Sequence, residues 1–125
     1  MIEHEVESRR AGRRCTAQRG ELCIDVDVAR RRMALHGELD SVTAPLLWEV
    51  YDAVCRSRAR WLTIDLHGVD FLAAGGVAAL VRLQDRAREA GGELCVIGAE
   101  GIVRRVLVLC GVDERLCGSG WESVR

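Results

Sequence analysis

The segment WLTIDL at residues 61–66 constrains the fold most, because it is a nearly continuous apolar strand and such strands lie centrally in a sheet. Helical patterns flank it: SVTAPLLWEVYDAVC comes before it, and AALVRLQDRAREAGG follows it after a short joint. Both helical segments carry an apolar stripe, and Gly91-Gly92 terminates the second. This alternation of strands and helices predicts right-handed crossovers and a parallel centre to the sheet.

The remaining elements complete an α/β pattern. ELCIDVDVA alternates apolar and polar residues, which is typical of a strand with one solvent-exposed face. A short arginine turn joins it to MALHGEL, so we expect these two strands to be antiparallel, with the first at an edge. ELCVIG is a further strand, EGIVRRVLVLCG a third helix, and residues 115–117 a last short strand or turn. The sequence predicts a single small α/β domain with a four- to five-stranded mixed sheet, an antiparallel edge strand and about three to four helices.

The two ends of the chain differ from this core. Residues 1–20 hold acidic residues first and an arginine-rich run after them, so we expect a mobile charged N-terminal arm or one extra helix. The domain itself is expected to span residues 21–117. Residues 118–125 are expected to form a C-terminal tail.

Charge and hydropathy exclude several classes of function. The chain carries a formal net charge of -1, which gives no general reason to expect nucleic acid or an anionic membrane as a partner. No stretch approaches the ~20 apolar residues that cross a bilayer, and the N-terminal sequence lacks the apolar block of a signal peptide. We therefore expect a cytoplasmic protein.

Cysteine is frequent for a chain of this size. In a reducing compartment most of the six are expected to be free thiols, and none of their spacings forms the C-x-x-C pair of a zinc or redox motif. The alternative is a thiol switch. One candidate for this switch is Cys23, a thiol that we expect on the edge strand. The others lie nearer the C-terminus, where Cys110 would form a disulfide with either Cys95 or Cys117.

The tripeptide Leu-His-Gly occurs twice, at the ends of two strands that we expect to be neighbours. On this interpretation His36 and His67 project to one face, where Asp40 or Asp70 would complete a metal site or a pH sensor. Two exposed histidines bonded to loop carbonyls are the commoner arrangement. We therefore predict no metal site.

The joint FLAAGGV at residues 71–77 lies between a strand and a helix, where α/β proteins often place their chemistry, yet it holds no hydroxyl, thiol, carboxylate or amine. The chain also contains no lysine, no glycine-rich phosphate loop and no histidine-linked nucleophile at a recognisable spacing. We predict a protein that is not an enzyme and takes no cofactor.

Three stretches resemble the STAS domain of bacterial anti-sigma factor antagonists: LHGELDSVTAPLLWEV, residues 61–98, and GIVRRVLVLCGVDERL. The most telling parts are G-E-L-D at residues 37–40 and D-L-x-x-V-x-F at residues 65–71, and the resemblance runs from about Glu21 to Cys117. It implies a binding module without catalytic activity. Such a module binds an anti-sigma factor, usually one with an ATP-binding kinase fold, and thereby frees a sigma factor.

The resemblance also implies where the partner binds. In the family the contact surface includes the loop after G-E-L-D and the strand-to-helix joint, where an aspartate, a phosphorylatable serine and a second hydroxyl residue precede a glycine. Here these three positions hold Ala73, Ala74 and Gly75, so the family's phosphorylation switch cannot operate at Ala74. The expected contact residues are Asp40, Ser41, Thr43, Leu72, Ala73, Ala74, Gly75, Gly76 and Val77.

Individual roles differ within this set. Asp40 offers charge to an arginine of the partner, and the alanines offer a close fit. Thr43 is expected to cap the first helix. Ser41 is included as a contact residue only because of its location in this loop.

Two alternatives remain open. The chain is an adaptor in a larger signalling assembly, responsive to oxidation through its cysteines and with other STAS proteins among its partners; or the altered joint binds nothing. Whether the chain is an antagonist or an adaptor, we expect a monomer or a weak homodimer.

Overall fold

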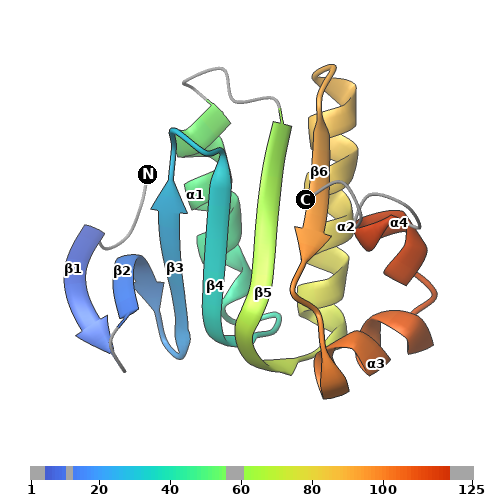
Figure 1. The fold of residues 1–125 in the computed structure, drawn as a ribbon, viewed down its shortest axis with the longest axis horizontal. Coiled ribbons are helices and arrows are strands. Elements are labelled where there is room, and N and C mark those ends of the chain that lie inside the picture. Colours follow the sequence, from blue (N-terminus) through green and yellow to red (C-terminus); the bar gives the residue numbers. More distant parts are fainter. Residues whose placement is uncertain (1–4, 11–12, 56–60, 119–125) are drawn as a thin grey trace.

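The computed structural model describes residues 5–10, 13–55 and 61–118. Its elements, in chain order, are strands, helices and their short connections (Figure 1): β1 (Glu5–Arg10), β2 (Arg13–Arg19), β3 (Leu22–Asp27), β4 (Arg32–Leu39), α1 (Ala44–Cys55), β5 (Trp61–Leu72), α2 (Ala74–Glu89), β6 (Glu93–Ile97), α3 (Gly101–Leu109) and α4 (Asp113–Cys117). Over these ranges the strands form one six-stranded sheet in the order β1-β2-β3-β4-β5-β6.

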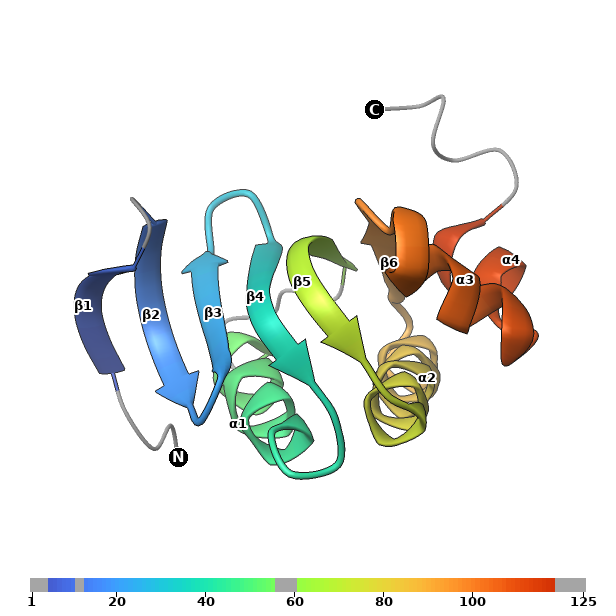
Figure 2. The same ribbon diagram turned by 90° about the horizontal axis from the view of Figure 1, so that it is seen from below.

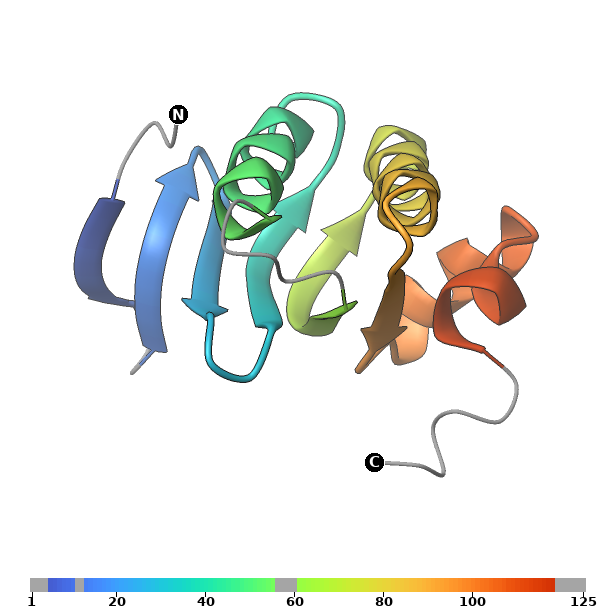
Figure 3. The same ribbon diagram turned by 90° about the horizontal axis from the view of Figure 1, so that it is seen from above.

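The predicted α/β domain with a mixed sheet is confirmed. β4, β5 and β6 pair in parallel, whereas β1 to β4 pair antiparallel. Figures 2 and 3 show α1 and α2 side by side on one face of the sheet, with α3 and α4 gathered at its β6 end. Among the described residues, no helix combines the length and apolar character needed to cross a bilayer.

The hydrophobic core lies between the sheet and this pair of helices. Leu62, Ile64 and Leu66 of β5 are buried at every second position, and the residues between them are half-buried. WLTIDL is therefore central in the sheet, as predicted, but only one of its two faces lies under α1 and α2. Leu47 of α1 and Leu80 of α2 are fully buried and belong to the same cluster.

The N-terminal residues extend the sheet instead of forming an arm. Residues 13–19 form β2, which pairs with β3, so β3 is not an edge strand. The prediction of a mobile arm or extra helix is therefore wrong for the part of residues 1–20 that the structure describes. Cys15 and Ala17 are fully buried while Thr16 and Gln18 are half-exposed, which is the period-two pattern of a strand. The many arginines of this segment concealed that pattern.

The chain after α3 also differs from the prediction. Residues 113–117 form the short helix α4, not a strand or turn. Its first turn carries Asp113 and Glu114, which favour a helix start because the amide groups there carry partial positive charge. Leu116 and Cys117 pack into the core. Most of the predicted tail, residues 119–125, lies outside the described residues.

Two cysteines that were expected to be free thiols form a disulfide. Cys15 on β2 and Cys23 on β3 are joined, with their Cα atoms 5.7 Å apart, inside the normal range for such a bridge. Cys95, Cys110 and Cys117 are free, so neither pairing proposed for Cys110 is present. Cys23 is buried in this bridge and does not lie on a solvent-exposed edge.

Gln84 is one of the few polar side chains in the core and ties three elements together. Its Nε2 donates to the carbonyls of Leu94 in β6 and of Arg115 in α4, each at 2.9 Å. Its Oε1 accepts from Arg115 Nε at 2.6 Å. Because Gln84 is 1% exposed, water cannot replace these bonds if the side chain is changed.

We predict that Gln84→Met, which keeps the length of the side chain but removes its hydrogen bonds, lowers the free energy of unfolding by about 1–3 kcal/mol. Urea denaturation followed by far-ultraviolet circular dichroism measures this difference. Glu89→Ala on the exposed face of the same helix is the control and is expected to stay within about 0.5 kcal/mol of the native protein. Equal midpoints for Gln84→Met and the control would contradict the prediction.

Candidate functional site

The two segments expected to contact a partner lie side by side in the structure. β4 and β5 are parallel neighbours, so the loop after each begins at the same edge of the sheet, with Leu39 opposite Leu72. The backbone amide of Ala73 donates to the carbonyl of Leu39 at 3.0 Å. Loop 40–43, between β4 and α1, and the first turn of α2 therefore form one continuous surface.

Two glycines bring these segments into close contact. A Cβ atom on Gly75 would lie 2.7 Å from the Cβ of Ser41 and 2.9 Å from its backbone nitrogen. A Cβ atom on Gly76 would lie 2.5 Å from the carbonyl oxygen of Leu39 and 2.9 Å from its carbonyl carbon. Real Cβ atoms do not approach backbone this closely, so the first turn of α2 reaches its position only because both residues lack a side chain.

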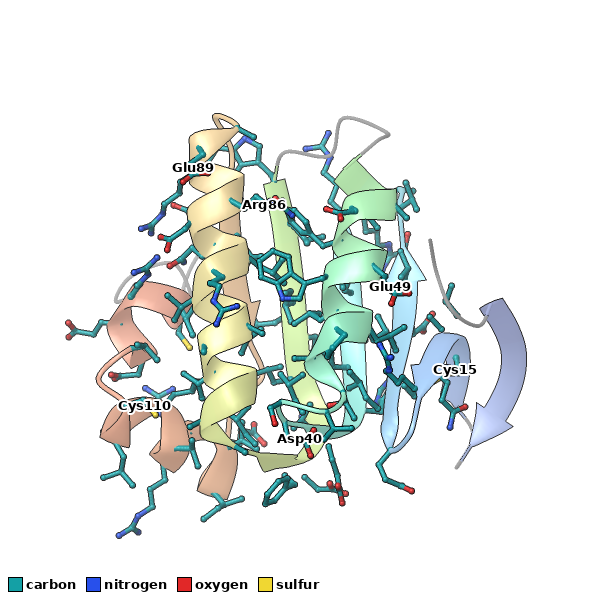
Figure 4. All side chains as sticks on the ribbon, turned by 180° about the vertical axis from the view of Figure 1, so that it is seen from behind. Cys15, Asp40, Glu49, Arg86, Glu89 and Cys110 are labelled. Carbon is teal, nitrogen blue, oxygen red and sulfur yellow. A yellow bond between two sulfur atoms is a disulfide. The ribbon has the colours of Figure 1, made fainter. Side chains whose placement is uncertain are left out.

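Asp40 organises the loop before α1. Its Oδ1 accepts from the backbone amides of Val42 at 2.9 Å and Thr43 at 3.0 Å. The hydrogen bond from the Thr43 amide is the main cause that lowers the pKa of Asp40, and it outweighs the opposing effect of partial desolvation. Figure 4 shows Asp40 at the end of α1 that meets this loop.

Thr43 was expected to cap α1 with its hydroxyl, and this detail is wrong. The residue does precede the helix, but its Oγ1 donates back to the carbonyl of Glu38 at 2.9 Å and accepts from the amide of Asp40 at 3.1 Å. The capping geometry belongs to Asp40, because its carboxylate meets the amides two and three residues ahead. Thr43 is buried and anchors the loop to β4.

The predicted contact residues fall into two groups by exposure. Ser41 and Ala74 are exposed, and Asp40, Ala73 and Gly75 are half-buried, so a partner can reach them. The other predicted residues are buried and support the surface from below: Thr43, Leu72, Gly76 and Val77.

The N-terminus of α2 carries no side-chain cap. Ala73 occupies the capping position with extended backbone, and it has no oxygen to offer the first amides of the helix. Ala74, the first helical residue, is exposed beside it. This end of the helix is therefore apolar at its side chains and rich in backbone donors.

Two exposed apolar side chains flank this surface and were not among the predicted contacts. Val42 is 73% exposed on loop 40–43, and Phe71 is 48% exposed just before the joint. In loop 40–43 the hydrogen bonds of Asp40 and Thr43 hold those side chains toward the protein, which leaves Val42 in solvent. An apolar residue inside a polar capping loop is the sequence feature that would have identified it.

The two histidines do not come together. The register of β4 and β5 shifts between Ala34 and His36, which places His36 opposite Gly68 rather than opposite His67. His67 is instead exposed, with its Nδ1 3.9 Å from a carboxylate oxygen of Glu100. Across the described ranges, no three side chains of the metal-binding types form a cluster.

Comparison with known proteins agrees with this fold. The family model described as "Mlab, STAS domain" matches residues 17–118. Among solved structures, an anti-sigma factor antagonist from Mycobacterium paratuberculosis is similar with a TM-score of 0.63 at 24% identity, over 82% of this chain and 89% of that one. The family match begins inside β2, so β1 lies outside it.

Two forms of SpoIIAA are similar as well. The unphosphorylated anti-sigma factor antagonist SpoIIAA has a TM-score of 0.55 at 13% identity, over 70% of this chain and 82% of that one. The Bacillus cell fate determinant SpoIIAA in its phosphorylated form has a TM-score of 0.57 at 14% identity, over 82% of this chain and 96% of that one. At these identities the likeness shows the fold.

We predict that Gly76→Ala destabilises the protein by about 1–3 kcal/mol, because the new methyl group must displace the backbone at Leu39. Ala74→Ser, two residues away on the exposed side of the same turn, is the control and is expected to change stability little. Urea midpoints measure both. A Gly76→Ala protein as stable as the control would show that β4 and α2 are not in close contact.

The lowered pKa of Asp40 gives a pH-dependent prediction. Its stabilising effect is complete above the ordinary aspartate value of 3.8 and is lost as pH falls through the lower pKa of the folded state. Asp40→Asn is therefore expected to be less stable than the native protein at pH 7, and the difference is expected to shrink as pH falls below about 3.8. Urea unfolding between pH 7 and pH 2.5 tests this. A difference that does not change with pH would exclude a role for the carboxylate charge.

Proposed function

Because this chain belongs to the STAS domain family, we propose that it is an anti-sigma factor antagonist, which binds an anti-sigma factor and thereby releases a sigma factor. The observation that carries the proposal is the single surface formed by loop 40–43 and the first turn of α2. The similar solved structures that are described as anti-sigma factor antagonists support it. The protein acts in the cytoplasm, where sigma factors act, and as a binding module without catalysis of its own.

The proposed partner is an anti-sigma factor with a kinase-like ATP-binding fold. The surface offers it a centre of small residues at Ala73, Ala74 and Gly75, with exposed apolar side chains at Val42 and Phe71. Small side chains let a partner's backbone approach the free amides at the start of α2. Asp40 is half-buried and held by its own loop, so its part in binding is to shape the loop as well as to offer charge.

Binding on this proposal is not controlled by phosphate at the usual position. A phosphoserine at the start of α2 would place about −1.5 to −2 charges on the surface. Ala74 has no oxygen to accept a phosphoryl group, and neither has its neighbour Ala73. The surface therefore stays in the unphosphorylated form that is open to a partner.

A second function, an adaptor in a larger signalling assembly, is favoured by one observation. α3 exposes three large apolar side chains to solvent: Ile102, Val108 and Leu109. An adaptor needs a second binding surface, and α3 lies at the β6 end of the sheet, away from α1 (Figure 3). Other STAS proteins are the partners expected for this role.

We predict that the purified protein binds a kinase-fold anti-sigma factor encoded in the same genome, and that Ala74→Glu weakens binding at least tenfold. The glutamate places a negative charge on the surface where a phosphate would stand. Isothermal titration calorimetry against each such anti-sigma factor measures the affinities.

Ala90→Glu introduces the same charge at the opposite, exposed end of α2 and serves as the control, with unchanged binding expected. Binding to none of these anti-sigma factors by the folded native protein would overturn the proposal. Binding to another STAS protein that is insensitive to Ala74→Glu would favour the adaptor.

A further inference from the structure

A groove of about 220 Å³ runs between α1 and α2 next to the proposed contact surface. Each wall follows one stripe of a helix: Ala44, Pro45 and Trp48 from α1, and small residues of α2 three or four positions apart. The lining is completed by the loop and by one arginine, and consists of Ser41, Ala44, Pro45, Trp48, Gly75, Ala78, Ala79 and Arg82.

The groove opens onto the surface already described and is bounded at its other end. Ser41 and Gly75 belong to both, so a partner on that surface meets the groove without a break. At the far end, Arg86 of α2 lies over the ring of Trp48, 5.1 Å from its centroid, and pairs with Asp52 of α1 at 3.2 Å. Figure 4 shows Arg86 and Asp40 toward opposite ends of the helix pair.

These contacts make the groove a formed feature. Arg86 holds the indole of Trp48 by a cation–π contact and joins the two helices through Asp52. Trp48 itself is half-buried. A half-exposed tryptophan held in place by its neighbours is typical of residues that dominate binding energy in protein interfaces.

Arg82 is the charged residue in the lining, and none of the described residues pairs with it. Its neighbours on the exposed side of α2 are paired: Arg86 with Asp52, and Arg88 with Glu93 at 3.0 Å. In the part of the chain that the structure describes, Arg82 makes no ion pair or hydrogen bond and is exposed. The groove thus combines apolar walls with one free positive charge.

Resting on the proposed function, we propose that this groove is the specificity pocket for the anti-sigma factor. It receives an apolar side chain of the partner against Trp48 and Ala78, while a neighbouring carboxylate of the partner pairs with Arg82. Apolar walls favour an apolar side chain. The uncompensated cation favours an acidic residue beside that side chain and disfavours a basic one, which is how charge contributes to the choice of partner.

Two substitutions test the two parts of this proposal against the purified kinase-fold anti-sigma factor. Arg82→Glu reverses the charge, and Ala78→Leu fills the groove. We expect at least a tenfold loss of affinity for the first and at least a fivefold loss for the second. The loss caused by Arg82→Glu is expected to shrink at 1 M salt, because screening weakens charge interactions.

Each substitution has a matched control on the exposed surface. Arg105→Glu makes the same change in net charge on α3, where Arg105 is exposed, and Ala90→Leu adds the same side chain at the far end of α2. Both controls are expected to bind within twofold of the native protein. Circular dichroism and urea midpoints establish that all four variants are folded.

The possible results separate this proposal from the function on which it rests. If the native protein binds and both groove variants bind equally well, the groove proposal is overturned and the antagonist function stands. If only Arg82→Glu loses affinity, insertion of an apolar side chain is overturned. If the native protein binds no anti-sigma factor, the proposed function fails and this proposal fails with it.

Discussion

The arrangement of the whole site depends on one close contact, between the end of β4 and the first turn of α2. The carbonyl oxygen of Leu39 accepts a hydrogen bond from the backbone amide of Ala73. Gly75 and Gly76 lie so close to Ser41 and Leu39 that a Cβ atom on either glycine would not fit. A helix that began with larger residues would stand farther from the sheet edge. Because α1 begins directly after the same loop, this contact also sets how closely the two helices approach each other at that end, and hence the width of the groove between them.

Much of this fold could be predicted from hydrophobic periodicity, because long elements repeat their pattern over many residues. The central position of WLTIDL and the parallel order of β4, β5 and β6 followed from that pattern. β2 did not, because Cys15 and Ala17, its buried side chains among the residues whose burial is described, give a weak apolar signal among arginines. The disulfide between Cys15 and Cys23 could not be predicted either, since it depends on the pairing of a strand that had not been identified.

The juxtaposition of the two candidate segments was predictable, but the hydrogen bonds of each residue in them were not. Strand order alone brings loop 40–43 and the start of α2 to one edge. Sequence does not determine which of two nearby oxygens faces the helix, so the cap was assigned to Thr43 although the carboxylate of Asp40 supplies it. The expected juxtaposition of His36 and His67 was wrong for a similar reason. β5 contains extra residues relative to β4, and such irregularities change which side chains are opposite one another.

These details bear on how charge is used at the surface. One carboxylate oxygen of Asp40 accepts hydrogen bonds from the loop that precedes α1. Its capacity to attract a basic residue of a partner is therefore reduced. Ala73 and Ala74 contribute no charge, and the first amides of α2 carry partial positive charge. Arg82 adds a full positive charge two turns along the same helix. The start of α2 and Arg82 thus present positive charge on this side of the surface, and on the proposed function a partner segment with an acidic residue fits it better than one with a basic residue. On the proposed function, this fixed charge contributes to the choice of partner at a joint where Ala74 has no oxygen to carry a phosphoryl group.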